Sequence, residues 1–525
     1  MAIDHPVSLT DAQDLASMIT DTCARYADKP AFSALGYTLN FNEVEQHSRA
    51  FAAYLQHHTD LQPGDRIALC LPNLLQFPIA AFGALRAGLV LVNTNPLYTP
   101  REMAHQWRDS GAKALVLLAD LAPRAASILD QTEITTVITT TALDFHQSTP
   151  AAGDFDNALS FMTLLTDGAD LPLKPVTRGA TELAALQYTG GTTGVAKGAM
   201  LSHANLLANA RQVLVRLGDA CREGEECFVV PLPLYHIYAF TVNLITFFAR
   251  GSLNVLIPNP RDLPAFVEQI RPFRVTGMAG LNTLFVGLCR LEAFCELDFS
   301  SLKLTISGGT ALTSAAAQIW QETTGCAISE GYGLSETSPV VCLNPIGQEQ
   351  LGTIGPALID TELKVVDDDG RATEEGELCV RGPQVMQGYW RMADETALVL
   401  DAAGWLKTGD IARIQADGYV RIVDRKKDMI LVSGFNVYPN EVEEVLSQLP
   451  GVLEAAVVGE PDPRSGEKVV AYLVSETELD LPGLKAHCRD NLTGYKQPRK
   501  YVRLAELPKS TVGKVLRREL RERQD

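Results

Sequence analysis

The chain has 525 residues, of which 46% are hydrophobic and 21% charged, a balance typical of a globular α/β enzyme rather than a disordered or fibrous protein. A chain of this length is expected to form two or more domains. The net charge of −18 argues against general nucleic-acid binding, because a phosphate backbone attracts cationic surfaces.

The first third of the chain predicts alternating helices and strands. Residues 8–59 are expected to begin as a helix and to contain an aromatic turn region near residues 32–41. Strands are predicted at 65–73, 89–96, 113–120 and 135–141, with a helix at 77–88. This alternation indicates a mostly parallel sheet. The stretch 142–182 has weak periodicity and is expected to connect two subdomains over the surface.

A second α/β series is predicted from Leu183, with strands near 226–232, 252–258, 273–278 and 302–307. Within it, residues 227–249 contain no Lys, Arg, Asp or Glu and are long enough to cross a bilayer. Pro231, Pro233, His236 and Asn243 interrupt this run. We therefore expect a buried strand, a polar turn and a buried helix, with a membrane span as the less favoured alternative.

From Asp360 the strands become shorter and are separated by turn signals such as DDDG, which predicts antiparallel hairpins or a small barrel. The last hundred residues contain an amphipathic helix at 439–451, two strand-like runs and a basic tail. The expected fold is α/β: two α/β subdomains and a small β-barrel-like subdomain over residues 1–424, and a small α+β domain over residues 425–525.

The C-terminal tail is basic, whereas the rest of the chain is acidic. From Lys485 to Asp525, twelve Lys or Arg residues stand against five Asp or Glu residues. This segment either faces phosphates or anionic lipid or is simply a solvated helix end. The ten cysteines form no CxxC pair, and the first residues lack a signal-peptide pattern, so we expect a cytoplasmic protein with reduced thiols.

The most informative segment is LQYTGGTTGVAKGAMLSH, residues 186–203. Its glycines allow backbone N–H groups to turn towards an anion, and its hydroxyls and lysine add donors and positive charge. It does not fit the pattern G-x-x-x-x-G-K-[ST]. We predict a polyphosphate site rather than a flexible surface turn, formed by Thr189, Gly190, Gly191, Thr192, Thr193, Gly194 and Lys197.

This loop resembles the AMP-binding signature of the adenylate-forming superfamily. Four further stretches agree in the family's order: SEGYGLSETSP (329–339), GWLKTGDIA (404–412), DRKKDMILVSGFNVYPNEVE (424–443) and PKSTVGKVLRREL (508–520). The resemblance covers essentially the whole chain and implies a ligase that converts ATP to AMP and pyrophosphate. Phrases such as YHIYAF, GPQVMQGYW and LTGYKQP resemble bacterial long-chain fatty acyl-CoA synthetases.

The resemblance assigns the nucleotide contacts. Thr192 and Glu336 match the family's Mg²⁺ site, where oxygen ligands hold a metal that bridges phosphates. Asp410 matches the residue that binds the ribose hydroxyls, and Arg425 its basic partner. The walls of the adenine slot correspond to Gly308, Gly309, Gly331, Tyr332 and Gly333.

The resemblance also assigns a mobile C-terminal domain. Lys514 matches the catalytic lysine that stabilises charge between carboxylate and α-phosphate. Lys427 occupies the hinge position, and the loop with Gly434 and Phe435 is expected to swing in and line the tunnel for coenzyme A.

The acid-binding side of the site is assigned to two stretches, 231–240 and 277–285. His236 is expected near the activated carboxylate as a catalytic residue. Tyr238, Phe240 and Gly280 are expected to form the acyl pocket, although plain core explains the aromatic residues equally well.

The leading prediction is therefore a long-chain fatty acid:CoA ligase that uses ATP, Mg²⁺ and coenzyme A. The alternative is a ligase for medium-chain or aryl acids. A catalytically silent acyl-binding protein is disfavoured because Lys514, Glu336 and Asp410 are all present. Peripheral contact with the inner membrane and a homodimer are left open as further partners.

Overall fold

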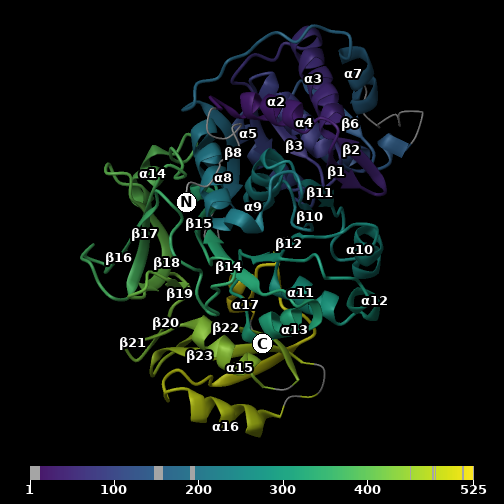
Figure 1. Cartoon of the computed structure of the whole chain (residues 1–525). Helices are drawn as coiled ribbons and strands as arrows, with labels where there is room; N and C mark the ends of the chain where they lie inside the picture. Colours follow the sequence, from purple (N-terminus) through teal and green to yellow (C-terminus); the bar gives the residue numbers. More distant parts are fainter. Residues whose placement is uncertain are drawn as a thin grey trace.

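A computed structural model describes residues 12–146, 158–189, 196–449, 451–475, 478, 480–510 and 513–523. The chain forms a large N-terminal part and a small C-terminal part, as the sequence predicts (Figure 1). In Figure 1 the N-terminal part runs from purple to green, and the C-terminal sheet lies below it in yellow-green and yellow.

The first sheet has seven strands in the order β7-β6-β5-β3-β4-β8-β9, and only the β8–β9 pair is antiparallel. Helices α5, α6 and α7 connect its strands. The bounds are β3 Arg66–Cys70, β4 Val90–Asn93, α5 Pro100–Ser110, β5 Ala112–Leu118, α6 Ala122–Ala126, β6 Thr136–Thr140, β7 Leu159–Ser160, α7 Phe161–Gly168, β8 Leu183–Thr189 and β9 Lys197–Ser202.

The second sheet has eight strands in the order β15-β14-β13-β12-β10-β11-β1-β2, parallel in the middle and antiparallel at both ends. Its bounds are β1 Pro30–Ala34, β2 Tyr37–Asn40, β10 Cys227–Val230, β11 Leu253–Leu256, α10 Leu263–Ile270, β12 Gly277–Gly280, α11 Asn282–Cys289, α12 Glu292–Cys295, β13 Leu304–Ser307, α13 Ser314–Thr324, β14 Ile328–Gly333 and β15 Val340–Leu343.

Two predictions about these sheets are wrong. The aromatic region near residues 32–41 is not a simple turn but the hairpin β1–β2, whose strand β1 pairs in parallel with β11 of the second sheet. The series from Leu183 does not begin the second sheet, because β8 and β9 complete the first one. The stretch 142–182, predicted to be a surface connection, also contains strand β7 and helix α7.

The main hydrophobic core lies between the two sheets. In β3, Ile67 and Leu69 belong to this shared core, whereas Ala68 and Cys70 pack on the opposite face of the sheet. This is the alternation that a strand buried on both faces requires. The helices of the shared layer are α2 Leu15–Arg25, α3 Phe41–His58, α4 Gln76–Arg86, α8 His203–Leu217, α9 Ile237–Ala239 and the π-helix η5 Phe240–Phe247.

Helix α4 is buried at every residue, which fits its place in that middle layer. The apolar run 227–249 is likewise internal: β10 is followed by the turn at His236, then α9 and η5, all within the core. The predicted buried strand, turn and helix are confirmed. None of the helices in the described ranges is both long and apolar enough to cross a membrane.

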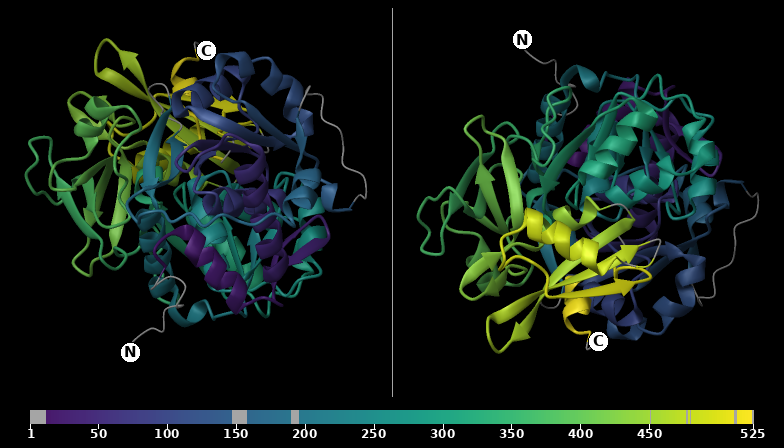
Figure 2. Two further views of the ribbon diagram at one scale, coloured as in Figure 1. Left: turned by 90° about the horizontal axis from the view of Figure 1, so that it is seen from above. Right: turned by 90° about the horizontal axis from the view of Figure 1, so that it is seen from below.

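A third sheet of four antiparallel strands projects from the side of the molecule, where both views of Figure 2 show it in green. Its pairing order β16-β17-β18-β19 confirms the antiparallel hairpins, but it is open, so a barrel is not confirmed. The bounds are β16 Glu362–Val366, β17 Gly376–Arg381, α14 Ala393–Val399, β18 Leu406–Ile414 and β19 Val420–Arg425.

The chain leaves this sheet at Arg425 and enters the C-terminal sheet at Ile430. The C-terminal part has its own hydrophobic clusters and a sheet in the order β21-β20-β23-β22, with β24 paired to β23. The bounds are β20 Ile430–Val432, β21 Phe435–Val437, α15 Pro439–Ser447, β22 Val452–Asp462, β23 Gly466–Ser475, α16 Leu481–Asn491, β24 Lys500–Leu504 and α17 Arg517–Arg521.

Candidate active site

The glycine-rich loop connects β8 to β9. Its central residues, predicted to hold phosphate, lie outside the described residues; they are Gly190, Gly191, Thr192, Thr193 and Gly194. Both ends of the loop are described, and Thr189 lies directly opposite Lys197 in the β8–β9 hairpin. The hairpin therefore fixes where the loop leaves and re-enters the first sheet.

Lys197 is linked through Tyr389 to the carboxylate that the sequence assigns to a metal. Its Nζ forms an ion pair with Glu395 of α14 and lies 5.1 Å from the ring centroid of Tyr389. The Tyr389 hydroxyl donates a hydrogen bond to Glu336 Oε1 at 2.7 Å. Tyr389 thus joins the lysine that follows the loop to Glu336.

The segment 386–390 places Tyr389 by backbone hydrogen bonds. The N–H of Met386 donates to the carbonyl of Glu336 at 2.8 Å, and the N–H of Trp390 donates to the carbonyl of Gly198 at 2.8 Å. Sequence reasoning missed Tyr389. It stands in the stretch GPQVMQGYW, whose resemblance indicated only a substrate class, and no spacing rule relates it to Glu336.

The predicted ribose carboxylate is almost fully buried and already held on both oxygens. The Tyr332 hydroxyl donates to Asp410 Oδ2, and Arg425 Nε lies 3.2 Å from Asp410 Oδ1. Asp410 and Arg425 are direct partners in the β18–β19 register. A carboxylate oxygen has two lone pairs, so each oxygen keeps an acceptor direction for a ligand hydroxyl.

Burial and this carboxylate together raise the pKa of Tyr332 well above its ordinary value. Its hydroxyl therefore stays protonated and remains a donor to Asp410. The structure brings Tyr332, Asp410 and Arg425 together, and it gives the tyrosine hydroxyl a contact that the predicted place in the wall of the adenine slot did not include.

The glycines of the predicted adenine slot mark close approaches of the backbone. A Cβ at Gly308 would lie 3.2 Å from the Tyr238 ring and 3.3 Å from the Gly331 carbonyl, and one at Gly333 would lie 2.1 Å from the Pro339 carbonyl. Gly309 has φ +89°, a conformation that side chains disfavour. Close contacts at Gly308 and Gly333 and the positive φ of Gly309 therefore favour glycine at the end of β13 and at the end of β14.

Lys514 reaches the same region from the C-terminal part. A Cβ at the preceding Gly513 would lie 3.1 Å from Leu281, which places this turn against the start of α11. The Lys514 side chain is accessible to solvent, yet the protein around it lowers its pKa to about 8, first by desolvation and then through the positive charge of Arg425. The negative charges of Asp410 and Glu336 act to raise the Lys514 pKa.

His236 completes this cluster at the N-cap of α9, where its Nδ1 accepts a hydrogen bond from the N–H of Tyr238 at 3.3 Å. Burial and the nearby charge of Lys514 lower the His236 pKa to about 4, so the ring is neutral at pH 7. The pKa of Lys427 is also lowered, to about 8, by desolvation and by Arg425.

The residues assigned to the acyl pocket and the coenzyme A loop are more scattered. Tyr238 lies against Gly308, Phe240 is buried in the shared core, and a Cβ at Gly280 would meet the Phe285 ring at 2.7 Å. Gly434 has φ +84° in the turn between β20 and β21, and the exposed Phe435 stacks on Tyr495 at a centroid distance of 4.8 Å.

No group of three or more His, Cys, Asp or Glu side chains is arranged to hold a metal ion in the described ranges. The predicted metal site needs fewer protein ligands, because Mg²⁺ is usually held by one or two carboxylates together with substrate phosphates and water. Glu336, oriented by Tyr389, fits that requirement.

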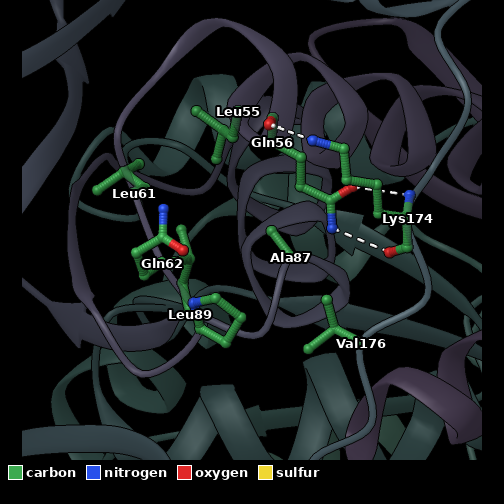
Figure 3. Close-up of a pocket in the computed structure, with 9 residues that line it drawn as sticks. Leu55, Gln56, Leu61, Gln62, Ala87, Leu89, Lys174 and Val176 are labelled. Carbon is green, nitrogen blue, oxygen red and sulfur yellow. Dashed lines mark hydrogen bonds between the residues drawn. The ribbon is translucent and has the colours of Figure 1, made fainter.

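A small pocket of about 150 Å³ lies elsewhere, at the end of α3 (Figure 3). Its lining includes Gln56, whose side chain exchanges two hydrogen bonds with the backbone of Lys174, at 3.0 and 2.9 Å. The pocket includes none of the predicted site residues. It lies where the segment that precedes β8 packs against α3.

The sequence matches two family descriptions. Residues 19–390 match the AMP-binding enzyme family, and residues 441–514 match the AMP-binding enzyme C-terminal domain. A curated long-chain-fatty-acid–CoA ligase from Escherichia coli is 47% identical over 532 residues, covering 97% of this chain and 94% of the relative.

Solved structures agree with the fold. An anthranilate CoA ligase in complex with anthranoyl-AMP superposes with a TM-score of 0.89 at 26% identity, covering 97% of this chain and 96% of the other. ATP-bound MatB from Rhodopseudomonas palustris gives a TM-score of 0.86 at 29% identity, covering 97% and 98%.

Proposed function

The chain belongs to the family of AMP-binding enzymes, and from this premise we propose that it joins long-chain fatty acids to coenzyme A in an AMP-forming reaction. The observation that carries the proposal is the 47% identity to a long-chain-fatty-acid–CoA ligase along almost the whole of both chains. The cluster of Lys514, Asp410, Arg425 and Glu336 supplies the charges that this chemistry needs.

The reaction has two steps. A carboxylate oxygen of the fatty acid attacks the α-phosphorus of ATP, the bond to pyrophosphate breaks, and acyl-AMP forms. The thiolate of coenzyme A then attacks the acyl carbonyl, and AMP leaves with the former carboxylate oxygen. The first step joins two anions, so positioning and charge neutralisation are the main tasks of the protein.

Lys514 performs the central part of that task. Lys514 is an exposed residue whose amine is influenced by Arg425 and Asp410, and we assign its ammonium group contacts with both the carboxylate and the α-phosphate. Asp410 binds the ribose hydroxyls through the acceptor directions that Tyr332 and Arg425 leave open. Thr189, Lys197 and the loop between them bind the β- and γ-phosphates.

Mg²⁺ would be held by Glu336 and Thr192 and would neutralise phosphate charge during the first step. Tyr389 keeps the Glu336 carboxylate oriented for this role.

The second step uses a mobile C-terminal domain over residues 425–525 with its hinge at Lys427. This boundary is supported by the change of sheet between Arg425 and Ile430. The influence of Arg425, Asp410 and Glu336 on the Lys514 amine supports assigning this arrangement to the adenylation step. Rotation would withdraw Lys514 and bring Gly434 and Phe435 to the tunnel for coenzyme A.

The fatty acid lies between α9 and the end of β12. His236 stands next to Lys514 and is neutral, so it can donate a hydrogen bond to the carboxylate without adding charge. Tyr238, Phe240 and Gly280 line the acyl chain in this proposal. The basic tail supports peripheral contact with the anionic inner membrane from the cytoplasm, and a homodimer remains a prediction.

A medium-chain or aryl acid ligase is the second candidate, favoured by the structural match to an anthranilate CoA ligase. The two are separated by a panel of palmitate, laurate, octanoate and benzoate, each with ATP and Mg²⁺ and scored for AMP with and without coenzyme A. Long-chain specificity predicts the highest kcat/KM for palmitate and AMP turnover that requires coenzyme A. A preference for octanoate or benzoate would contradict it, and Lys514→Ala serves as the inactive control.

A further inference from the structure

Two neighbouring residues of β19 point to different parts of the molecule. Arg425 faces Asp410 in the site, whereas Asp424 is fully buried and faces the C-terminal part. Successive side chains of a strand alternate in direction, so one strand serves both contacts. Asp424 Oδ1 accepts the N–H of Arg425 at 2.7 Å, and Oδ2 accepts the N–H of Asn440, the second residue of α15, at 2.8 Å.

Arg517 extends this contact to the segment that carries Lys514. Its Nη2 donates to Asn440 Oδ1 at 2.8 Å and to both oxygens of Glu443 at 2.8 Å, and its Nη1 lies 3.9 Å from Asp424 Oδ1. Arg517 is the first residue of α17 and lies three residues after Lys514 (Figure 1). A short piece of backbone therefore links the buried carboxylate to the active-site amine.

The contacts of Asp424 with Asn440 and Arg517 cross the proposed hinge, whereas those of Arg517 with Asn440 and Glu443 lie on its C-terminal side. Asp424 precedes Lys427, whereas Asn440 and Arg517 follow it. A second contact of Asn440, from its side-chain amide to the carbonyl of Val423 at 3.3 Å, crosses at the same place. By contrast, the pair between Arg521 and Asp428, 3.0 Å apart, lies wholly on the C-terminal side.

We propose that Asp424 and Arg517 are positioning residues for the adenylation step. Together with Asn440 they dock α15 and α17 onto β19, and this docking holds Lys514 beside Asp410 and Arg425. The same contacts must break before the domain rotates for thiol transfer. The inference rests on the proposed function and on its hinge. It predicts that Asp424, a buried carboxylate outside the site, affects only the adenylation half-reaction.

A purely structural role predicts something different. Asp424 is buried, so removing its charge would weaken packing in general, and both half-reactions would then fall together. A positioning role lowers adenylation selectively, because thiol transfer proceeds after the contacts have separated. The two half-reactions therefore distinguish the roles within the same protein sample.

The test uses the full-length chain with Asp424→Asn, which keeps the shape of the side chain but removes its charge and one acceptor. Adenylation is measured as palmitate-dependent exchange of pyrophosphate into ATP, and thiol transfer as palmitoyl-CoA formed from preformed palmitoyl-AMP. We expect the rate of adenylation to fall about 10- to 100-fold, a loss typical of a small misplacement of a catalytic group. The rate of thiol transfer should stay within about twofold of the wild-type rate. Arg517→Lys, which keeps the charge but loses the planar fork, should show the same selectivity.

Arg521→Gln is the matched control, because it removes another arginine pair of α17 that does not cross the hinge; both half-reactions should be unchanged. Equal losses in the two half-reactions, or no loss in either, for folded Asp424→Asn and Arg517→Lys would overturn the proposal. If Asp424→Asn does not fold, Arg517→Lys alone decides by the same comparison. A wild-type protein without palmitate-dependent exchange would instead refute the proposed function.

Discussion

At the scale of single residues, the site is a set of charges that oppose one another. Lys514 and Arg425 are positive, Asp410 and Glu336 are negative, and the other three act on the pKa of the Lys514 amine. Such an arrangement suits a reaction in which two anions must meet, because the cations are placed before the substrates arrive. Of the four, Lys514 alone lies after the proposed hinge at Lys427.

Replacing Lys514 with alanine should therefore separate the half-reactions. We expect adenylation to fall at least about 10²- to 10³-fold, the loss typical of removing one preorganised electrostatic group, with thiol transfer from preformed acyl-adenylate largely spared. Lys509→Ala is the control, because Lys509 lies in the same segment but pairs with Glu454. Equal loss of both half-reactions in Lys514→Ala would refute the assignment.

The lowered pKa of Lys514 predicts a pH dependence. An ordinary lysine stays protonated up to a pKa of 10.5, but Lys514 loses its charge as the pH rises through about 8. The charged form is the active one, so kcat/KM for adenylation should fall above pH 8 by about tenfold per unit. In Lys514→Arg the remaining activity should stay level to higher pH. A wild-type profile that is flat up to pH 10 would contradict this role.

The hydrogen bond from Tyr389 to Glu336 predicts an effect on magnesium. Tyr389→Phe keeps the ring beside Lys197 but leaves the carboxylate without its donor. We expect the Mg²⁺ concentration for half-maximal adenylation to rise roughly tenfold, as for other residues that orient metal ligands. Tyr419→Phe, which loses a hydrogen bond to the Gln348 carbonyl, is the control. An unchanged magnesium requirement would show that Tyr389 does not orient a ligand.

The sequence could identify most of these residues but not their contacts. Asp410, Arg425 and Lys514 stand in recognisable motifs, whereas Tyr389 acts through Glu336 and Asp424 lies near Arg517, partners that are far away in the chain. Nothing in local spacing predicts such pairs, because they arise from the packing of segments that the chain brings together only in three dimensions.

At the scale of elements, the turn between β14 and β15 depends on glycine. A Cβ at Gly333 would lie 2.1 Å from the Pro339 carbonyl oxygen, and its three nearest neighbours are all backbone atoms of Pro339 and Val340, which cannot move aside as a flexible side chain could. Gly333→Ala should destabilise the N-terminal part by more than about 2 kcal/mol, as overpacking against backbone does. The measurement is the urea concentration at the unfolding midpoint.

Gly494→Ala is the control for that substitution, because no atom lies within 4 Å of a Cβ at Gly494. Its unfolding midpoint should match that of the wild type. An equal effect of the two substitutions would show that the close contact at Gly333 does not limit stability.

Regular elements followed from the sequence where their periodicity was strong. The parallel strands β3, β4, β5 and β6 and the buried helix α4 were predicted close to their observed bounds. The hairpin β1–β2 was not, because its aromatic residues also suit a turn region. Its strand character depends on pairing with β11, more than two hundred residues later.

In the whole molecule, each of the two large sheets contains strands that come from separate stretches of the sequence. The N-terminal hairpin joins the second sheet, and β8 and β9 join the first, so the two units share one core instead of folding in succession. Sequence order alone suggests successive units, and only the pairing reveals this arrangement. The division into a large N-terminal and a small C-terminal part could be predicted, because the strand pattern changes after residue 424.

In the proposed reaction, the carboxylate of a fatty acid attacks the α-phosphorus of ATP at this site. The most direct measurement uses palmitate with oxygen-18 in both carboxylate oxygens, together with ATP, Mg²⁺ and coenzyme A, followed by mass spectrometry of the nucleotide. We expect AMP that carries one labelled oxygen, because the bridging oxygen stays on phosphorus when the thiol displaces AMP from the acyl group. Unlabelled AMP, or ADP together with labelled phosphate, would contradict it.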